Sequence, residues 1–157
     1  MELMRAKFGL IETKEEDASL IQDLLALMQL YHVDYTNFFR ALGLFQTGGE
    51  SPKDPLRDFF MDRESFDQWA RRYKDRLREE GSRDGDRLAR MNRVNPKYVL
   101  RNYLAQTAIE KAQQKDFSEI DRLLTLLQNP YSDQPGMDAY AVPPPNWGKH
   151  LSVSCSS

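Results

Sequence analysis

Apolar residues recur every three or four positions through most of this 157-residue chain, and these stretches end near glycines or prolines. The clearest stripes are Leu20, Leu24, Leu27 and Tyr31; then Phe66, Trp69, Tyr73 and Leu77; then Leu100, Leu104, Ala108 and Ala112. Such spacing places the apolar side chains on one face of an α-helix. No convincing strand pattern precedes residue 129. The sequence therefore predicts an all-α fold, built as an irregular array of helices.

Capping residues predict where these helices begin. Thr13, in the sequence TKEE, has the spacing of a capping box. Asp34 and Asp62 precede apolar stripes, so we expect their carboxylates to cap the helices that follow. Asn95 is followed by a proline at the first helical position, which predicts another helix start there.

The composition changes at Asn129. Five of the eight prolines follow it, and the sequence VPPPNW predicts polyproline II structure. Large apolar residues still recur there, including Trp147 and Leu151, so we expect this tail to dock on the helices, and a disordered tail is the alternative. We divide the chain into a helical region, 1–128, and an extended docked tail, 129–157, which ends in the sequence SCSS.

Charge and hydropathy restrict the partners. The formal net charge of −2 gives no general reason to expect nucleic acid or an anionic membrane as a partner. No apolar run approaches the ~20 residues that span a bilayer. The first residues lack the apolar core of a signal peptide, and a single cysteine excludes an internal disulfide. We expect no nucleic-acid partner, no membrane association and a cytoplasmic location.

Two runs of basic residues lie on predicted helices. The first consists of Arg71, Arg72, Lys74, Arg76 and Arg78, and the second of Arg83, Arg87, Arg90, Arg93, Lys97 and Arg101. Acidic residues intersperse the first run, which favours a solvated helix face over nucleic-acid binding. Fewer acids flank the second run, which we interpret as a weak candidate for contact with a phosphate or an acidic surface.

No self-contained active site is visible. Gly48 and Gly49 lack the lysine that a phosphate-binding loop requires. His150 and Cys155 would lie roughly 16 Å apart in an extended chain, too far for a base and its nucleophile. Two histidines and one cysteine cannot supply an ordinary zinc site, and His32 is better explained as a helix-boundary residue. We predict no catalytic, cofactor-binding or metal-binding residue in this chain.

Several stretches, in order along the chain, resemble a known family: MRAKFGL, DYTNFFRAL, PLRDFF, VNPKYVLRNYLAQTAIEKA and PPNWGKHLSVSCSS. Together they resemble the C-terminal part of the selenoprotein O family, whose bacterial members are called YdiU. The resemblance implies a parent with a kinase-like, pseudokinase-type fold that binds ATP with Mg²⁺ or Mn²⁺. Such a parent transfers AMP to hydroxyl groups of Ser, Thr and Tyr in other proteins. The family's nucleotide-binding, catalytic and metal-binding residues lie upstream of the matched region, so none maps onto this chain.

The resemblance also implies a role for Cys155. In some animal members of the family, selenocysteine occupies this position, and a thiol near a C-terminus can reach a partner and exchange. The resemblance suggests that Cys155 pairs with a cysteine of the catalytic region. Because Cys155 is the only cysteine here, in this chain it can pair only with another chain or with small thiols. An inert, exposed tail cysteine is the alternative.

Two functional hypotheses lead, and a nucleic-acid-binding helical domain ranks below them because of the acidic balance. The first is the C-terminal portion of a protein adenylyltransferase, inactive alone, which contributes scaffold and a redox-responsive tail. Its partners would be the missing N-terminal kinase-like region and the protein substrates of the parent. The alternative is a stand-alone helical interaction module that binds a partner through Trp147 and the proline run, or through the basic helix.

Overall fold

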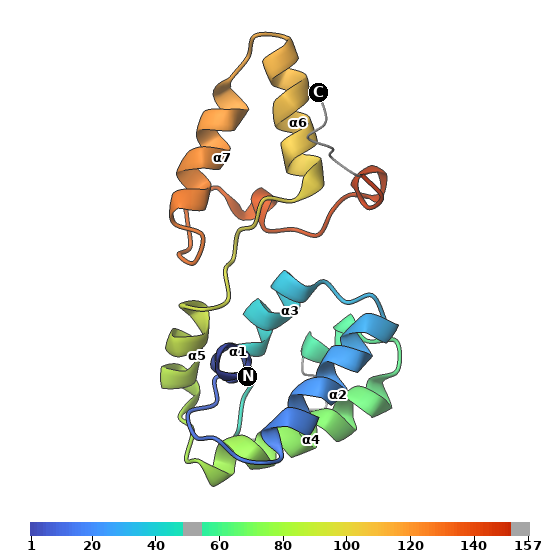
Figure 1. Cartoon of the computed structure of the whole chain (residues 1–157), viewed down its shortest axis with the longest axis vertical. Helices are drawn as coiled ribbons and strands as arrows, with labels where there is room; N and C mark the ends of the chain where they lie inside the picture. Colours follow the sequence, from blue (N-terminus) through green and yellow to red (C-terminus); the bar gives the residue numbers. More distant parts are fainter. Residues whose placement is uncertain (49–54, 152–157) are drawn as a thin grey trace. The chain divides into compact units, whose positions relative to one another are not determined.

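The computed structural model describes residues 1–48 and 55–151, and within these ranges it contains α-helices and short 3₁₀ turns but no β-strand (Figure 1). The all-α prediction is therefore confirmed. The chain divides into two compact units, Met1–Asn95 and the residues from Pro96 onward. The helices of the first unit are α1 (Glu2–Lys7), α2 (Asp17–Leu30), α3 (Tyr35–Leu42), α4 (Arg63–Glu79) and α5 (Asp84–Asn92). The second unit holds α6 (Asn102–Gln113) and α7 (Ser118–Gln128). No helix in the described ranges has the length and apolar character needed to cross a bilayer.

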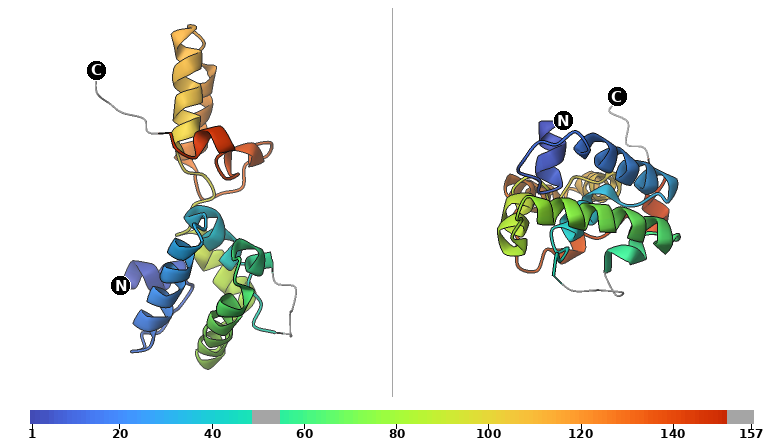
Figure 2. Two further views of the ribbon diagram at one scale, coloured as in Figure 1. Left: turned by 90° about the vertical axis from the view of Figure 1, so that its right-hand side faces the viewer. Right: turned by 90° about the horizontal axis from the view of Figure 1, so that it is seen from below.

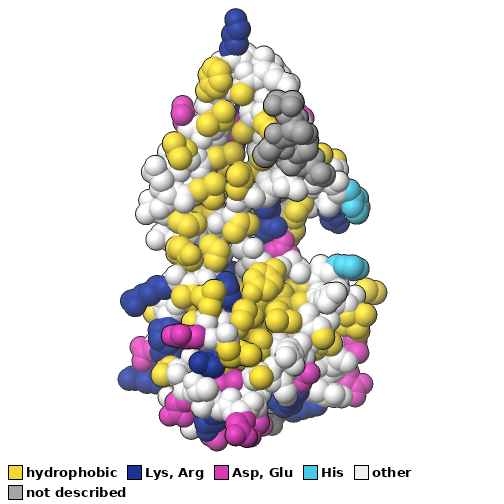
Figure 3. All heavy atoms as spheres, in the orientation of Figure 1, with side chains coloured by type: hydrophobic (Ala, Val, Ile, Leu, Met, Phe, Trp, Pro, Cys, Tyr) yellow, Lys and Arg dark blue, Asp and Glu magenta, His cyan; other side chains and the backbone are white. Residues whose placement is uncertain are grey.

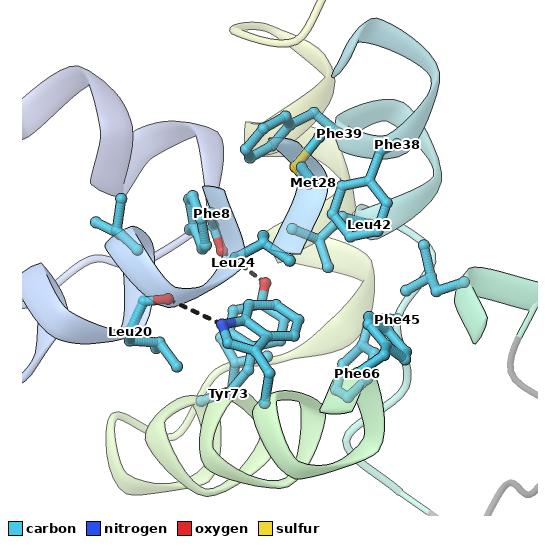
Figure 4. Close-up of a cluster of buried hydrophobic side chains, with 14 of the residues drawn as sticks. Phe8, Leu20, Leu24, Met28, Phe38, Phe39, Leu42, Phe45, Phe66 and Tyr73 are labelled. Carbon is cyan, nitrogen blue, oxygen red and sulfur yellow. Dashed lines mark hydrogen bonds between the residues drawn. The ribbon is translucent and has the colours of Figure 1, made fainter. Parts of the chain in front are cut away.

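An aromatic core holds the first unit together. Helices α2 and α4 lie side by side (Figure 2), and their apolar stripes face each other. Phe8, Trp69 and Tyr73 are buried between them and neighbouring helices, and their rings meet edge to face or stacked (Figure 4). The buried Trp69 Nε1 donates to the Leu20 carbonyl oxygen at 2.8 Å, and the Tyr73 hydroxyl donates to the Phe8 carbonyl oxygen at 2.6 Å. The polar atoms of these two aromatic side chains are thus paired, as burial requires.

Two of the predicted caps are confirmed. The Asp34 carboxylate accepts the Asn37 backbone N–H at 2.9 Å and begins α3. The Asp62 carboxylate accepts two backbone N–H groups at the start of α4. The capping box at Thr13 is wrong, because α2 begins four residues later at Asp17 without a side-chain cap from Thr13. The Asp17 carboxylate takes part in a tertiary network instead.

The predicted helix start at Asn95 is also wrong, since the next helix begins at Asn102. Asn95 is buried, and its Nδ2 donates to the Lys7 carbonyl oxygen at 2.9 Å while its Oδ1 accepts from Lys7 Nζ at 3.2 Å. A tertiary contact therefore uses the side chain that the local pattern assigned to a cap. Leu100, which we placed in a buried stripe, is 57% exposed.

The second unit has a small core. Helices α6 and α7 pack against each other and bury Tyr103, Leu104, Ala108 and Leu123 between them. Residues from the following segment, including Leu151, pack against this cluster. Pro145 has φ −61° and ψ 163°, the polyproline II values that the proline run predicts.

Candidate functional site

The predicted redox residue, Cys155, lies outside the described residues, as does Gly49 of the glycine pair. His32 lies at the end of α2 with a positive φ of 51°, where the Val33 N–H bonds the Met28 carbonyl oxygen. It is thus a helix-boundary residue, as predicted. Among residues 1–48 and 55–151, no group of three or more His, Cys, Asp and Glu side chains is arranged to bind a metal ion.

The first basic run does not form a uniformly solvated face, and for Arg76 that prediction is wrong. Arg76 is buried, and its Nε donates to Asp17 Oδ1 at 2.8 Å while its Nη1 donates to Glu80 Oε2 at 2.9 Å. Its Nη2 donates to the Glu12 carbonyl oxygen at 2.9 Å. Burial alone lowers the pKa of Arg76, but hydrogen bonds to the two carboxylates outweigh it and hold the pKa above its ordinary value. This guanidinium fixes the segment before α2 onto α4.

Arg87, from the second basic run, is entirely buried and so cannot meet an external phosphate. It donates to Asp84 Oδ1 at 2.8 Å and to the Phe45 carbonyl oxygen. Asp84 also accepts hydrogen bonds from the backbone N–H and hydroxyl of Thr47. Burial raises the pKa of Asp84, yet the bonds from Arg87 and Thr47 outweigh it, so the pKa lies below its usual value. The network anchors the segment from Phe45 to Thr47.

A groove of about 370 Å³ lies between α2 and α4. Its walls are formed by Asp23, Ala26, Leu27, Leu30, Ser65, Gln68, Trp69 and Arg72. Arg72 forms an ion pair with Asp23 across this groove. Four of the lining side chains are apolar and four are polar, and the two charged ones, Asp23 and Arg72, are paired with each other.

A polar cluster of the second unit lies where the tail contacts α6 and α7. We call this surface the tail dock and define it as Asn102, Tyr103, Lys111, Glu119 and Arg122. The Glu119 carboxylate is buried and accepts three hydrogen bonds. They come from the Tyr140 hydroxyl at 2.6 Å, Lys111 Nζ at 2.9 Å and Arg122 Nη1 at 3.1 Å. Tyr140 belongs to the tail, so Glu119 holds the tail to both helices.

The electrostatics of the tail dock follow from this pairing. Burial raises the pKa of Glu119, but the hydrogen bonds from Tyr140 and Lys111 outweigh it and hold the pKa below its usual range. Burial, together with the bond to this carboxylate, raises the pKa of the Tyr140 hydroxyl. Glu119 therefore stays ionised near neutral pH and Tyr140 stays protonated, which preserves the bond between them.

The last described residues contact the beginning of α6. The rings of Tyr103 and Trp147 meet edge to face with centroids 6.1 Å apart. A Cβ atom at Gly148 would lie 2.7 Å from the Tyr103 Cβ, so this close approach needs glycine. Asn102 Nδ2 donates to the Leu151 carbonyl oxygen at 2.8 Å. These contacts fix the tail as far as Leu151.

Sequence reasoning missed the residues that bind the tail. The sequence indicates Trp147 and Leu151 as apolar residues of a proline-rich segment. It gives no sign that Glu119, an acidic residue in the first turn of a helix, binds the tail. Its partner Tyr140 is 21 residues further along the chain, so no local pattern joins them. The tail dock binds the tail through three contacts. The Glu119 carboxylate accepts a hydrogen bond from Tyr140, the Tyr103 ring meets the Trp147 ring edge to face, and Asn102 donates to a backbone carbonyl oxygen.

Comparison with known proteins assigns this helical chain to a family. The family model described as protein adenylyltransferase SelO matches residues 1–128, so the chain belongs to the SelO family. The matched region ends at the last residue of α7.

Relatives extend the similarity over the tail. The chain is 55% identical over 157 residues to protein nucleotidyltransferase YdiU of Myxococcus xanthus, a match to 100% of this chain and 32% of that protein. It is 57% identical over 155 residues to the protein of the same name from Thioalkalivibrio sulfidiphilus, covering 99% of this chain and 31% of the relative. The Herminiimonas arsenicoxydans protein of that name is 52% identical over 156 residues, again with 31% of its length covered. The chain thus spans about a third of the length of these relatives.

Proposed function

We propose that this chain is the C-terminal portion of a cytoplasmic SelO-type protein adenylyltransferase, which transfers AMP from ATP to Ser, Thr or Tyr hydroxyls of other proteins. The match to the SelO family over residues 1–128 carries the proposal. The relatives are named protein nucleotidyltransferases, which supports the same reaction class. In the proposal, ATP and Mg²⁺ or Mn²⁺ bind to a kinase-like region that lies outside the matched third, and this chain alone is inactive.

The proposed contribution of the chain is a scaffold with a redox-responsive tail. The tail dock holds the chain as far as Leu151, and Cys155 follows four residues later. In thiol–disulfide exchange, the Cys155 thiolate attacks a disulfide of the partner, forms one S–S bond and releases one thiolate, so no further oxidant is consumed. A disulfide within reach of the tail is the expected partner.

A chimera tests the proposal. The aligned third of the Myxococcus xanthus relative is replaced by this chain, and both the chimera and the chain alone are incubated with a substrate protein and ATP labelled on the α-phosphate, with Mg²⁺ or Mn²⁺. We expect label transfer by the chimera and none by the chain alone. Absence of transfer by a folded chimera, under conditions where the intact relative is active, would refute the assignment.

The redox role is tested separately in the same chimera. We expect the response of AMP transfer to oxidised and reduced glutathione to disappear in the Cys155→Ser variant. An unchanged response in that variant would show that Cys155 is an inert tail residue.

A further inference from the structure

Helix α7 carries two apolar faces, and its own unit covers only one of them. Leu123 and Leu126 point inward and are buried. On a neighbouring face, Ile120 is 43% exposed and Leu124 is 59% exposed. The face extends beyond the helix, through Phe117 before it and Tyr131 after it, both of which are exposed. We call Phe117, Ile120, Leu124 and Tyr131 the outer stripe.

The residues of the outer stripe have the spacing of one face of an α-helix. Ile120 and Leu124 are four residues apart, which places them above one another on a helix surface. Leu127, half-buried, continues the same line. Asp121 and Thr125 are polar and exposed. Each follows a residue of the outer stripe by one position and so lies about 100° further round α7. A helix that is apolar on two adjacent faces is characteristic of one packed on two sides.

The second unit has no further element among its described residues to cover the outer stripe. Its buried cluster consists of four residues between α6 and α7, and the tail is already engaged at the tail dock. Figure 3 shows hydrophobic side chains gathered on the surface of this unit. Additional apolar contact would stabilise a unit with so small a core.

We propose that the outer stripe packs against the part of a SelO-type polypeptide that lies outside the matched third. This inference rests on the proposed function. The size of that part favours it as the occupant, because the chain covers only 32% of the Myxococcus xanthus relative and leaves about two-thirds of that protein to supply a partner surface. The outer stripe contains no charged residue, so the complementary surface is apolar, as in the packing of one domain against another.

Thiol labelling measures whether the outer stripe is covered. Cys155→Ser removes the only cysteine of the chain, and Leu124→Cys then places a thiol on the outer stripe. Thr125→Cys, one residue further on the polar side of α7, is the matched control. Each variant is labelled with iodoacetamide, both in the chain alone and in the chimera, and the rate at the introduced cysteine is followed by mass spectrometry of its peptide.

In the chain alone, we expect similar labelling rates at the two positions. In the chimera, the rate at position 124 falls by about tenfold or more, while the rate at position 125 is unchanged, because protection follows burial. Equally fast labelling at position 124 in the chain and the chimera would overturn the inference. Slow labelling at position 124 in the chain alone, recovering on dilution, would assign the outer stripe to a second copy and would also overturn it.

The outcome for the surface is separable from the outcome for the activity. Labelling reports burial of position 124 whether or not the chimera transfers AMP. Protection without AMP transfer would support the outer stripe as an internal interface and refute the proposed activity. AMP transfer without protection at position 124 would support the proposed activity and refute the outer stripe as an internal interface.

Discussion

Replacing Arg76 by methionine should destabilise the first unit more than any exposed substitution on α4. Arg76 pairs with two carboxylates whose side chains are themselves almost fully buried, 1% exposed for Asp17 and 0% for Glu80. Methionine preserves the apolar stem of the side chain but removes the guanidinium. Both carboxylates would then lie in the interior without their counter-charge.

The expected loss follows from that uncompensated charge. Removal of one partner from a buried ion pair costs about 3–5 kcal/mol, whereas an exposed pair contributes about 0–1 kcal/mol. Loss of the bond from Arg76 Nη2 to the Glu12 carbonyl oxygen adds to this cost. Because a domain of this size has a total stability of about 5–15 kcal/mol, the variant should be close to its stability limit.

The unfolding of the first unit can be followed by itself. Of the two tryptophans, Trp69 is buried in the core of the first unit and Trp147 lies in the second unit. In a Trp147→Phe background, fluorescence during urea unfolding therefore reports the first unit alone. We expect Arg76→Met to lower the urea midpoint with an unchanged slope, since the surface exposed on unfolding is the same.

Arg71→Met is the matched control, because Arg71 is exposed on the same helix, and it should change stability by less than about 0.5 kcal/mol. The double variant Asp17→Asn with Arg76→Met should be less unstable than the sum of the two single changes, because it leaves fewer unpaired charges. A decrease of less than about 1 kcal/mol in the free energy of unfolding for Arg76→Met would refute the reasoning. The ion pairs of Arg76 would then contribute no more than solvent-exposed pairs do.

Three further predictions concern the backbone and the tail dock. His32→Gly should raise the free energy of unfolding of the first unit by about 1 kcal/mol, measured by the same Trp69 fluorescence, because His32 has a φ of 51° that glycine adopts without strain. Gly148→Ala should release the tail and speed tryptic cleavage after Lys149, because the added Cβ would lie 2.7 Å from the Tyr103 Cβ; Gly85→Ala, with open space around the added atom, should not. The pKa of Glu119 is lowered in the folded state, so its stabilising contribution is complete above the unfolded value of about 4.3 and is lost as the pH falls through the folded value. Urea unfolding followed by circular dichroism at pH 7 and pH 3 should thus show a smaller pH effect in Glu119→Gln than in the unchanged chain.

The features that the sequence predicted correctly depend on residues close together in the chain. The features that it missed depend on residues far apart in the chain. Apolar periodicity and the aspartate caps Asp34 and Asp62 act within four residues, so they can be recognised along the chain. Arg76 donates a hydrogen bond to Asp17, which lies 59 residues away in the sequence. Asn95 donates to Lys7, which lies 88 residues away. In both cases the tertiary partner outweighs the local preference, because a buried polar group must be paired wherever its partner lies.

The tail dock and the outer stripe share α7, which links the two. Glu119 and Leu124 lie on different faces of one helix of eleven residues, so packing of the outer stripe restrains the same backbone that carries the tail's main anchor. A helix ordered by one contact has less conformational entropy to lose on making the second. Tryptic cleavage after Lys149 should therefore be slower in the chimera than in the chain alone, and Leu124→Lys should remove this difference while Thr125→Lys preserves it. Equal cleavage rates in chain and chimera would mean that the tail is anchored independently of the outer stripe.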